Sequence, residues 1–307
     1  MGANPHCCQK DLNVKMINNL VEKYYKNQER HHGLNNKKDF EKQAKPWLDA
    51  GTIDSWRHER MYAFTDSLTK SNPHSRWLTV GDGRYGCEAH YLIEHGVNVL
   101  ATDINIDLLK DANGAKYINS FKRENAEKLS FDDNTFDFVL CKESYHHFPR
   151  PIIALYEMLR VAKKAIVLIE PNDVKKRGFS WSRFWSVDTL NTQVNRFEVS
   201  GNYVYSVSRR EIEKVAFGIG LPAIAFAGVD DIYIKSAGSE RVGDNTFNYM
   251  KIRLLLWILE ICYRLGIRDR SLLVSVIFKE KPSLKIINEL NNYGYNVRLL
   301  PKNPYVK

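Results

Sequence analysis

The chain changes texture near residue 73, beyond which short apolar runs alternate with segments whose apolar residues recur at helical spacing. Six runs have the length and composition of buried strands: Trp77–Val80, Val97–Thr102, Phe136–Cys141, Ala165–Ile169, Ala223–Val229 and Leu272–Phe278. Parallel sheets are built from such strands with helices between them. The pattern predicts an α/β fold with a mostly parallel sheet and helices on both of its faces.

Local signals place several of the helices between these strands. Cys87–His95 is amphipathic and follows the first predicted strand. Pro151 suits the first turn of a helix, and apolar residues recur at helical spacing after it. Ser208 and Glu211 form a capping box, which predicts a helix that ends at Gly220.

The same pattern divides the chain into three parts with one insertion. Residues 1–72 are mostly helical in pattern and are predicted to form an N-terminal extension or cap, with Pro73 at its boundary. Residues 73–283 are predicted to form the α/β domain. Within it, residues 172–207 are too long for an ordinary connection and are interpreted as an inserted lid. Residues 284–307 are basic and aromatic, and they form a C-terminal tail with no predicted role.

One long apolar segment, residues 252–267, is interrupted by three charged residues. It is too short and too charged to span a bilayer, so no transmembrane segment is predicted. Within it, an apolar stripe recurs at helical spacing: Leu254, Leu255, Ile258, Leu259 and Cys262. Such a stripe is expected to face the core, although a dimer interface or a helix on a membrane surface has the same pattern.

The formal net charge of +9 favours an anionic substrate, a nucleic acid or a membrane surface without choosing among them. Much of the excess lies in the first 45 residues, where a solvated helix face explains it. The 5 cysteines show neither a Cys-x-x-Cys pair nor the spacing of a zinc site, and the first residues lack the apolar core of a signal peptide. These features predict a reducing, cytoplasmic location.

A glycine-rich turn follows the first predicted strand, at Gly81-Asp-Gly83-Arg-Tyr-Gly86. Glycines let the chain turn sharply and let the backbone approach a ligand, and the next helix directs its free N–H groups toward a negative group. Asp103 closes the second strand 22 residues after Gly81, where a carboxylate can accept both hydroxyls of a ribose. This pattern alone fits NAD-binding proteins equally well.

The next block separates the two interpretations. Glu124-Asn-Ala-Glu-Lys-Leu-Ser-Phe131-Asp leads into the strand Phe136–Cys141, which is followed by Lys-Glu-Ser-Tyr-His-His147-Phe and later by Val167-Leu-Ile-Glu-Pro171. In register over residues 76–171, this series resembles class I S-adenosylmethionine-dependent methyltransferases of the ubiquinone/menaquinone-methylase type (methyltransferase domain 11). The resemblance implies a Rossmann-like fold with a mostly parallel seven-stranded sheet, and S-adenosylmethionine as the cofactor.

The resemblance also implies the residues that contact this cofactor. Gly81, Asp82 and Gly83 would hold its methionine and ribose, and Asp103 would bind the ribose hydroxyls. The adenine would lie against three residues: Ile104, Asn125 and Ala126. The sequence departs from the family pattern where Asn125 stands in place of an acidic residue and Tyr85 fills a position that is usually small.

Candidate catalytic residues follow the strand Phe136–Cys141, because ligands of open α/β sheets bind beyond the carboxyl ends of the strands. Glu143, His146 and His147 fall there, and a histidine is the preferred general base, with His146 ahead of His147. Glu143 and the two histidines could also join Glu170 and Asp173 in a metal site. Clusters of this kind are common without metal, so no metal is predicted.

Contacts to the methyl acceptor are assigned to Tyr145 and to the inserted segment. That segment is rich in aromatic and cationic residues, and Arg183, Trp185 and Arg196 are its chosen candidates. Aromatic faces stack on rings and sugars, and cations attract carboxylates or phosphates. A polar or anionic small molecule is therefore the expected acceptor.

The predicted function is O-methylation of a polar small molecule, such as a sugar or a sugar acid, by in-line methyl transfer assisted by a histidine base. The alternatives are an NAD-dependent oxidoreductase, a nucleic-acid methyltransferase and a non-catalytic module that only binds cofactor. Lys142-Glu-Ser-Tyr stands where amino-methylating enzymes of nucleic acids carry Asn/Asp-Pro-Pro-Tyr/Phe, so a nucleic-acid partner is not expected. A homodimer is left open.

Overall fold

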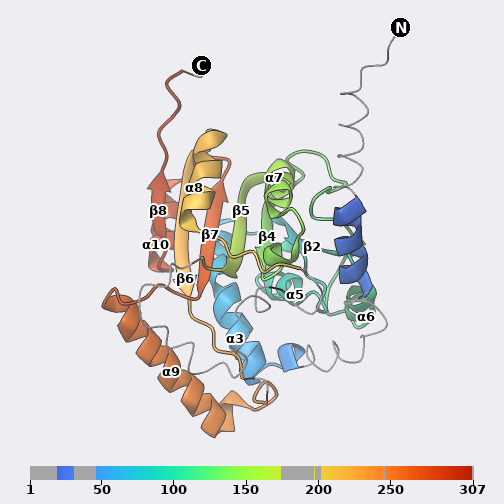
Figure 1. The fold of residues 1–307 in the computed structure, drawn as a ribbon, viewed down its shortest axis with the longest axis vertical. Helices are drawn as coiled ribbons and strands as arrows, with labels where there is room; N and C mark the ends of the chain where they lie inside the picture. The colour runs from blue at the N-terminus through green and yellow to red at the C-terminus, as the bar shows by residue number, and fades with distance from the viewer. Residues whose placement is uncertain are drawn as a thin grey trace.

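The computed structural model describes residues 19–30, 46–173, 197, 202–234, 236–244 and 246–305. Across this part of the chain, eight strands form one sheet in the order β3-β2-β1-β4-β5-β7-β6-β8 (Figure 1). The parallel half of the sheet has five strands: β1 (Arg76–Val80), β2 (Asn98–Asp103), β3 (Phe121–Arg123), β4 (Phe136–Lys142) and β5 (Ala162–Pro171). The predicted mostly parallel α/β fold is confirmed.

The other half of the sheet is antiparallel. It contains β6 (Ala223–Val229), β7 (Leu272–Phe278) and β8 (Asn296–Leu299), with β7 between β5 and β6. The eighth strand, β8, pairs with β6 and follows α10 (Leu284–Asn292). Residues 284–299, which have no predicted role, therefore extend the sheet beyond the seven strands that the family resemblance implies.

Side chains alternate between the two faces of the sheet, and each face has its own core. Trp77 and Phe138 lie in one core, while their neighbours Leu78 and Val139 lie in the other. The first core is covered by α4 (Asp66–Ser71), α5 (Cys87–Glu94), α6 (Asp107–Gly114) and α10, together with Met61 and Tyr62 of the helix Ile53–Tyr62. The second is covered by α7 (Pro151–Val161) and α8 (Arg209–Gly218), and Ser208 caps α8 by accepting the Glu211 N–H.

Two helical segments flank the edge of the sheet where the parallel strands end. Residues 19–30 are helical and lie next to the loops after β2 and β3, at the right of Figure 1. α3 (Ile53–Tyr62) starts at Thr52, whose hydroxyl accepts the Ser55 N–H, and continues through η2 (Ala63–Thr65) into α4. Both segments reach the functional region described below.

The expected core position of the apolar stripe in residues 254–262 is wrong. These residues belong to α9 (Phe247–Arg264), which stands outside the sheet (Figure 1), with Leu254 57% and Ile258 42% exposed. The side of α9 that packs carries Ile252, which is buried against Ile53, while Leu255, Leu259 and Cys262 are only half-buried. Among the described helices, none combines the length and apolar character needed to cross a membrane.

Candidate functional site

The glycine-rich turn after β1 is packed directly against the loop after β4. Gly81 has a φ of 81°, and a Cβ at this position would lie 2.4 Å from the Ser144 Cβ. The Ser144 hydroxyl donates to the Gly81 carbonyl over 2.7 Å. A side chain at position 81 would therefore force apart the two loops that carry the predicted cofactor and catalytic residues.

The carboxylate of Asp82 forms hydrogen bonds within the glycine-rich turn and its flanking elements. It is 2% exposed, accepts the Ala89 N–H at 2.9 Å and receives the Thr79 hydroxyl at 2.8 Å. Burial, together with the nearby Glu88, raises the pKa of Asp82 well above its usual value. The side chain thus ties the turn to the start of α5, which leaves backbone groups as the part of Asp82 suited to a ligand.

Asp103 lies at the end of β2, directly opposite Gly83. A Cβ on Gly83 would come within 2.6 Å of the Asp103 carboxylate, so only glycine allows this approach. The carboxylate accepts the Asn105 N–H at 2.8 Å. Burial raises the pKa of Asp103 to about 6, although backbone N–H groups counter part of this rise. A desolvated carboxylate facing a glycine turn suits the two hydroxyls of a ribose.

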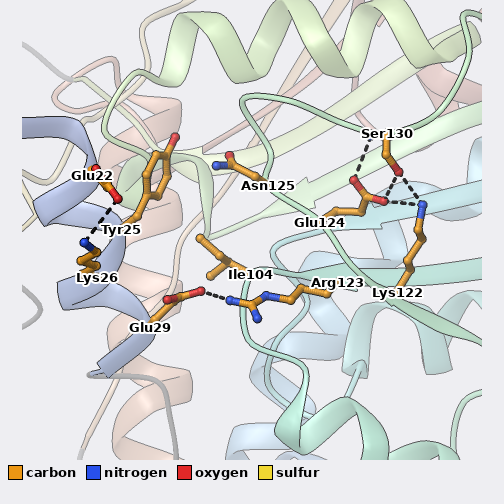
Figure 2. Close-up of a pocket in the computed structure, with 10 residues that line it drawn as sticks. All are labelled: Glu22, Tyr25, Lys26, Glu29, Ile104, Lys122, Arg123, Glu124, Asn125 and Ser130. Atoms are coloured by element: carbon orange, nitrogen blue, oxygen red, sulfur yellow. Dashed lines mark hydrogen bonds and ion pairs between the residues drawn. The ribbon is translucent and has the colours of Figure 1, made fainter. Parts of the chain in front are cut away.

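Beside Asp103 lies a cavity of about 480 Å³, shown in Figure 2. Ile104 and Asn125 line it from the loops after β2 and β3, and Tyr25 and Glu29 line it from helix 19–30. The Asn125 side chain also accepts the Glu127 N–H at 2.9 Å, which fixes the turn. Ile104 and Tyr25 supply apolar surface in a lining that is otherwise polar and charged, so the cavity and Asp103 together suit a flat polar group such as adenosine.

Helix 19–30 is seated on this site by polar contacts at several points. Gln28 donates to the carbonyl of His147, and Arg123 pairs with Glu29. Tyr25 interacts with Glu127, whose carboxylate pairs with Arg150 over 2.6 Å. The helix therefore forms the outer wall of the cavity, a role that its solvated helical pattern in the sequence did not reveal.

Ala126 is placed differently from its neighbour Asn125. It is 9% exposed and packs in the core beneath α7, and it is not one of the residues that line the cavity. Its contribution to an adenine site would be to keep the turn close to the sheet.

Glu143 follows β4 with a φ of 47° and takes part in a buried charge network. Lys142, whose side chain is 2% exposed, lies 2.8 Å from Glu143 and 3.5 Å from Glu88. Burial would raise the pKa of Glu143, but the attraction of Lys142 outweighs it and holds the pKa well below its usual range. Glu143 is therefore an ionised partner of Lys142 and a weak proton acceptor.

His58 connects α3 to this network. Its Nδ1 lies 4.0 Å from the Glu143 carboxylate, and its ring packs against Trp47 at 4.0 Å between centroids. Burial, followed by the charge of Lys142, lowers the pKa of His58 well below its usual value. The neutral imidazole is thus a fixed polar group on the wall contributed by α3.

His146 has the geometry of an oriented base. Its Nδ1 lies 2.7 Å from Glu170, at the end of β5, and the residue is 7% exposed. Glu170 also accepts the N–H groups of Ser144 and Tyr145, both at 2.9 Å. With Nδ1–H donating to this carboxylate, the lone pair of the imidazole is on Nε2, the atom that would take up a proton.

The other two residues of this turn are placed differently. The His147 ring packs on the His146 ring at 4.1 Å between centroids, and its carbonyl receives Gln28 from helix 19–30. Tyr145 is 1% exposed and packs edge-on against Phe148 and Tyr205. Its ring is thus part of the core beneath the site, away from the surface on which an acceptor would lie.

The remaining substrate candidates, Arg183, Trp185 and Arg196, lie outside the described residues. The two ends of the insertion that carries them are described and lie together at the end of β5. Val207 donates to the Pro171 carbonyl at 2.8 Å, and Asp173 donates to the Val207 carbonyl at 2.9 Å. The returning chain also reaches the His146 carbonyl through Asn202 and Tyr205, each at 3.5 Å.

The structure does not bring the possible metal ligands together. Glu143 is paired with Lys142, whereas Glu170 is engaged by His146 and two backbone N–H groups. Within the described residues, His, Cys, Asp and Glu side chains form no group of three or more that could hold a metal ion.

The sheet order and the glycine turn opposite Asp103 define a Rossmann-like fold with the architecture of a nucleotide-binding site. Residues 78–169 match the family model described as a methyltransferase domain. We therefore identify the chain as a methyltransferase enzyme that uses S-adenosylmethionine, as the sequence predicts. A search of curated proteins finds no match to it.

Solved structures with a similar arrangement include three bacterial and archaeal proteins. One, from Thermotoga maritima, is described as a SAM-dependent methyltransferase and possible histamine N-methyltransferase; it is 16% identical, with a TM-score of 0.45 over 74% of this chain and 93% of its own. The YcgJ protein of Bacillus subtilis is 16% identical, with a TM-score of 0.48; the match covers 74% of this chain and 100% of the YcgJ chain. A SAM-dependent methyltransferase of Methanosarcina mazei is 16% identical, with a TM-score of 0.45; the match covers 69% of this chain and 95% of the other chain.

Sequence reasoning did not assign to this site three residues that the structure places in it. Glu170 was considered only as a metal ligand, and Lys142 and His58 received no role. Glu170 had a usable signal, because it ends a buried strand next to the strand that precedes His146. Lys142 had a weaker one, as a cation at the end of an otherwise apolar strand. The contact of His58 with Glu143 joins residues far apart in the chain and had no local signal.

Proposed function

We propose that the protein methylates an oxygen atom of a polar small molecule and that His146 acts as the general base. The observation that carries this proposal is the 2.7 Å contact between His146 Nδ1 and Glu170. A carboxylate on Nδ1 fixes the tautomer and stabilises the imidazolium that forms when Nε2 takes a proton. Glu170 acts on the reaction through His146 and is therefore a positioning residue.

Bound S-adenosylmethionine supplies an electrophilic methyl group on a sulfonium. Asp103 would accept the ribose hydroxyls, Gly81 and Gly83 would let the backbone approach the cofactor, and Ile104 with Asn125 would face the adenine. His146 would then remove the proton of the acceptor hydroxyl, and Glu170 would hold the ring in place while it does so. The ion pair of the buried Lys142 with the partly exposed Glu143, together with His58, would give the acceptor side a fixed, partly dehydrated polar wall.

The proposed acceptor is polar and carries a negative charge. The support is the sequence of the insertion, which holds Arg183 and Arg196, together with the return of its described end to within hydrogen-bonding distance of the His146 carbonyl. The cations that line the cofactor cavity are already paired with carboxylates: Lys26 with Glu22, Lys122 with Glu124 and Arg123 with Glu29. An anionic acceptor would thus depend on the arginines of the insertion. The buried thiols Cys87 and Cys141 suit the proposed reducing, cytoplasmic compartment.

Labelled S-adenosylmethionine tests this function in extracts supplemented with the protein. Mass spectrometry should find a labelled methyl ether on an anionic metabolite, and the His146→Ala variant should not produce it. With that acceptor, the double variant Arg183→Ala and Arg196→Ala should raise the KM for the acceptor much more than the KM for the cofactor. A labelled product methylated on nitrogen or carbon, or an uncharged acceptor used equally by the double variant, would contradict the proposal.

A further inference from the structure

The outer surface of α9 is an uncovered apolar stripe. Its members recur at spacings of three, four and seven residues, which places them on one side of a helix with about 3.6 residues per turn. They are Phe247, Met250, Leu254, Trp257, Ile258 and Ile261, and we call them the outer stripe. Every member is an exposed large apolar side chain, with Phe247 79% and Trp257 62% accessible.

The opposite side of α9 anchors the helix to the protein. Ile252 is fully buried with Ile53 and Ala237, and Tyr249 packs edge-on against Trp56 of α3 at 5.3 Å. The outer stripe therefore lies on the side of α9 opposite the one that packs against α3. Apolar patches of this kind on a folded protein mark sites of contact with a partner or a membrane.

Positive side chains border the outer stripe on both sides. At helical spacing, Arg253 and Arg264 lie along one border and Lys251 lies along the other. Glu260, the acidic residue of α9, lies on the same border as Arg253 and Arg264 and pairs with Arg264 and Arg270, so this border keeps a net positive charge. An apolar face with aromatic residues, framed by long cationic side chains, is the pattern of a helix that lies in the interface of an anionic bilayer.

We propose that α9 docks the protein on the surface of a membrane that contains anionic phospholipids. The outer stripe enters the boundary between headgroups and acyl chains, and Lys251, Arg253 and Arg264 reach the phosphates. A second copy of the chain fits this surface less well. Two such faces in contact would place cations opposite cations, since Glu260, the acidic residue of α9, is already paired with Arg264 and Arg270.

The docking surface also has a defined relation to the methyl-transfer site. In the antiparallel pairing of β5 with β7, Pro171 lies opposite Leu272, the first residue of β7. The segment between β6 and β7, which contains α9, therefore joins the sheet at the edge where Glu170 lies. α3 contacts α9 through Trp56 and reaches Glu143 through His58. A docked α9 would thus hold the cofactor edge of the sheet toward the bilayer.

Vesicle flotation of the full-length protein tests the proposal. We expect the protein to float with vesicles of phosphatidylcholine mixed with phosphatidylglycerol and to bind much less to phosphatidylcholine alone. The double variant Leu254→Glu and Trp257→Glu should lower partition onto the mixed vesicles by at least about tenfold, because both side chains lose their burial in the lipid. The variant Phe217→Glu, which changes an exposed aromatic residue on α8, is the matched control and should bind as the unaltered protein does.

Charge is tested separately with Arg253→Gln and Arg264→Gln, which should weaken binding to the mixed vesicles but leave the residual binding to phosphatidylcholine unchanged. Unaltered S-adenosylmethionine affinity and circular dichroism would show that the variants are folded. Failure to bind either kind of vesicle, or equal binding by Leu254→Glu/Trp257→Glu and Phe217→Glu, would overturn the proposal. So would a dimer in ultracentrifugation that Leu254→Glu/Trp257→Glu converts to a monomer, because the outer stripe would then belong to a second copy.

Discussion

Two regions at the same edge of the sheet are built by different means. In the first, around Gly81, Gly83 and Asp103, close approach of the backbone creates the site, and the residues come from one turn and the next strand. In the second, around Lys142, His146 and Glu170, side chains from α3, β4 and β5 meet in a buried network of charges. The first region has the geometry to bind a cofactor, and the second has the geometry to hold a proton acceptor. Separate effects of mutation on binding and on turnover are therefore expected.

The largest expected effect is that of His146→Ala. Loss of the proposed base should lower turnover by about 100-fold or more while leaving cofactor affinity close to normal. His147→Ala is the matched comparison, since its ring packs on the His146 ring, whereas the contact with Glu170 belongs to His146. We expect it to have a much smaller effect. Turnover with the true acceptor and calorimetric titration of the cofactor would measure both. Equal losses in the two variants would remove the distinction between His146 and His147.

Asp103→Ala should have the opposite effect to His146→Ala: it should weaken cofactor binding more than it lowers turnover. Removing charge-assisted hydrogen bonds worth roughly 1.5–3 kcal/mol should weaken S-adenosylmethionine binding by about 10- to 100-fold. Turnover at saturating cofactor should fall far less. The exposed carboxylate of Asp132 provides the control, because Asp132→Ala should change neither quantity. Calorimetry would decide, and unchanged affinity in a folded Asp103→Ala protein would refute the cofactor assignment.

Glu170→Gln should lower turnover by about tenfold and alter its pH dependence. The carboxylate stabilises the protonated form of His146, so its loss should move the acidic limb of the turnover profile to lower pH. A purely structural role for Glu170 would lower activity without moving that limb. Glu280→Gln, at an exposed position after β7, should leave the profile as it is.

The smallest expected effect is that of pH on cofactor binding in the region around Gly81, Gly83 and Asp103. Because burial raises the pKa of Asp103 to about 6, acidification protonates the carboxylate that the ribose needs. Cofactor affinity should therefore fall by about tenfold between pH 8 and pH 5, whereas the affinity of Asp103→Asn should vary much less. The folded state also keeps a proton that the unfolded chain releases near pH 3.8, so Asp103 lowers the free energy of unfolding as the pH rises toward about 6.

The contrast between the two regions also explains what the sequence could reveal. The glycine turn, Asp103 and six of the strands have local signatures, and β6 and β7 have the bounds that their apolar runs predict. By comparison, β3 and β8 are short edge strands with polar residues and no continuous apolar run, so the hydrophobic pattern did not predict them. The pairing of Glu170 with His146 depends on the order of strands, which periodicity does not specify.

α9 shows a different limit of the same reasoning. Its apolar residues recur at helical spacing as core residues do, and hydrophobicity alone cannot tell which side of a helix the protein covers. Ile252 and Tyr249 hold the inner side, and the longer stripe remains on the surface. The orientation was settled by packing against α3, a contact between segments that are distant in the sequence.

Helix 19–30 has a consequence for the rate of the catalytic cycle. It forms one wall of the cavity beside Asp103 (Figure 2), so spent cofactor held there would leave more readily when that helix lifts from its seat. One of its attachments, Arg123 to Glu29, lies at the surface, where dissolved ions screen it. The residence time of the cofactor should therefore shorten as ionic strength rises, and product release becomes a step that salt can accelerate.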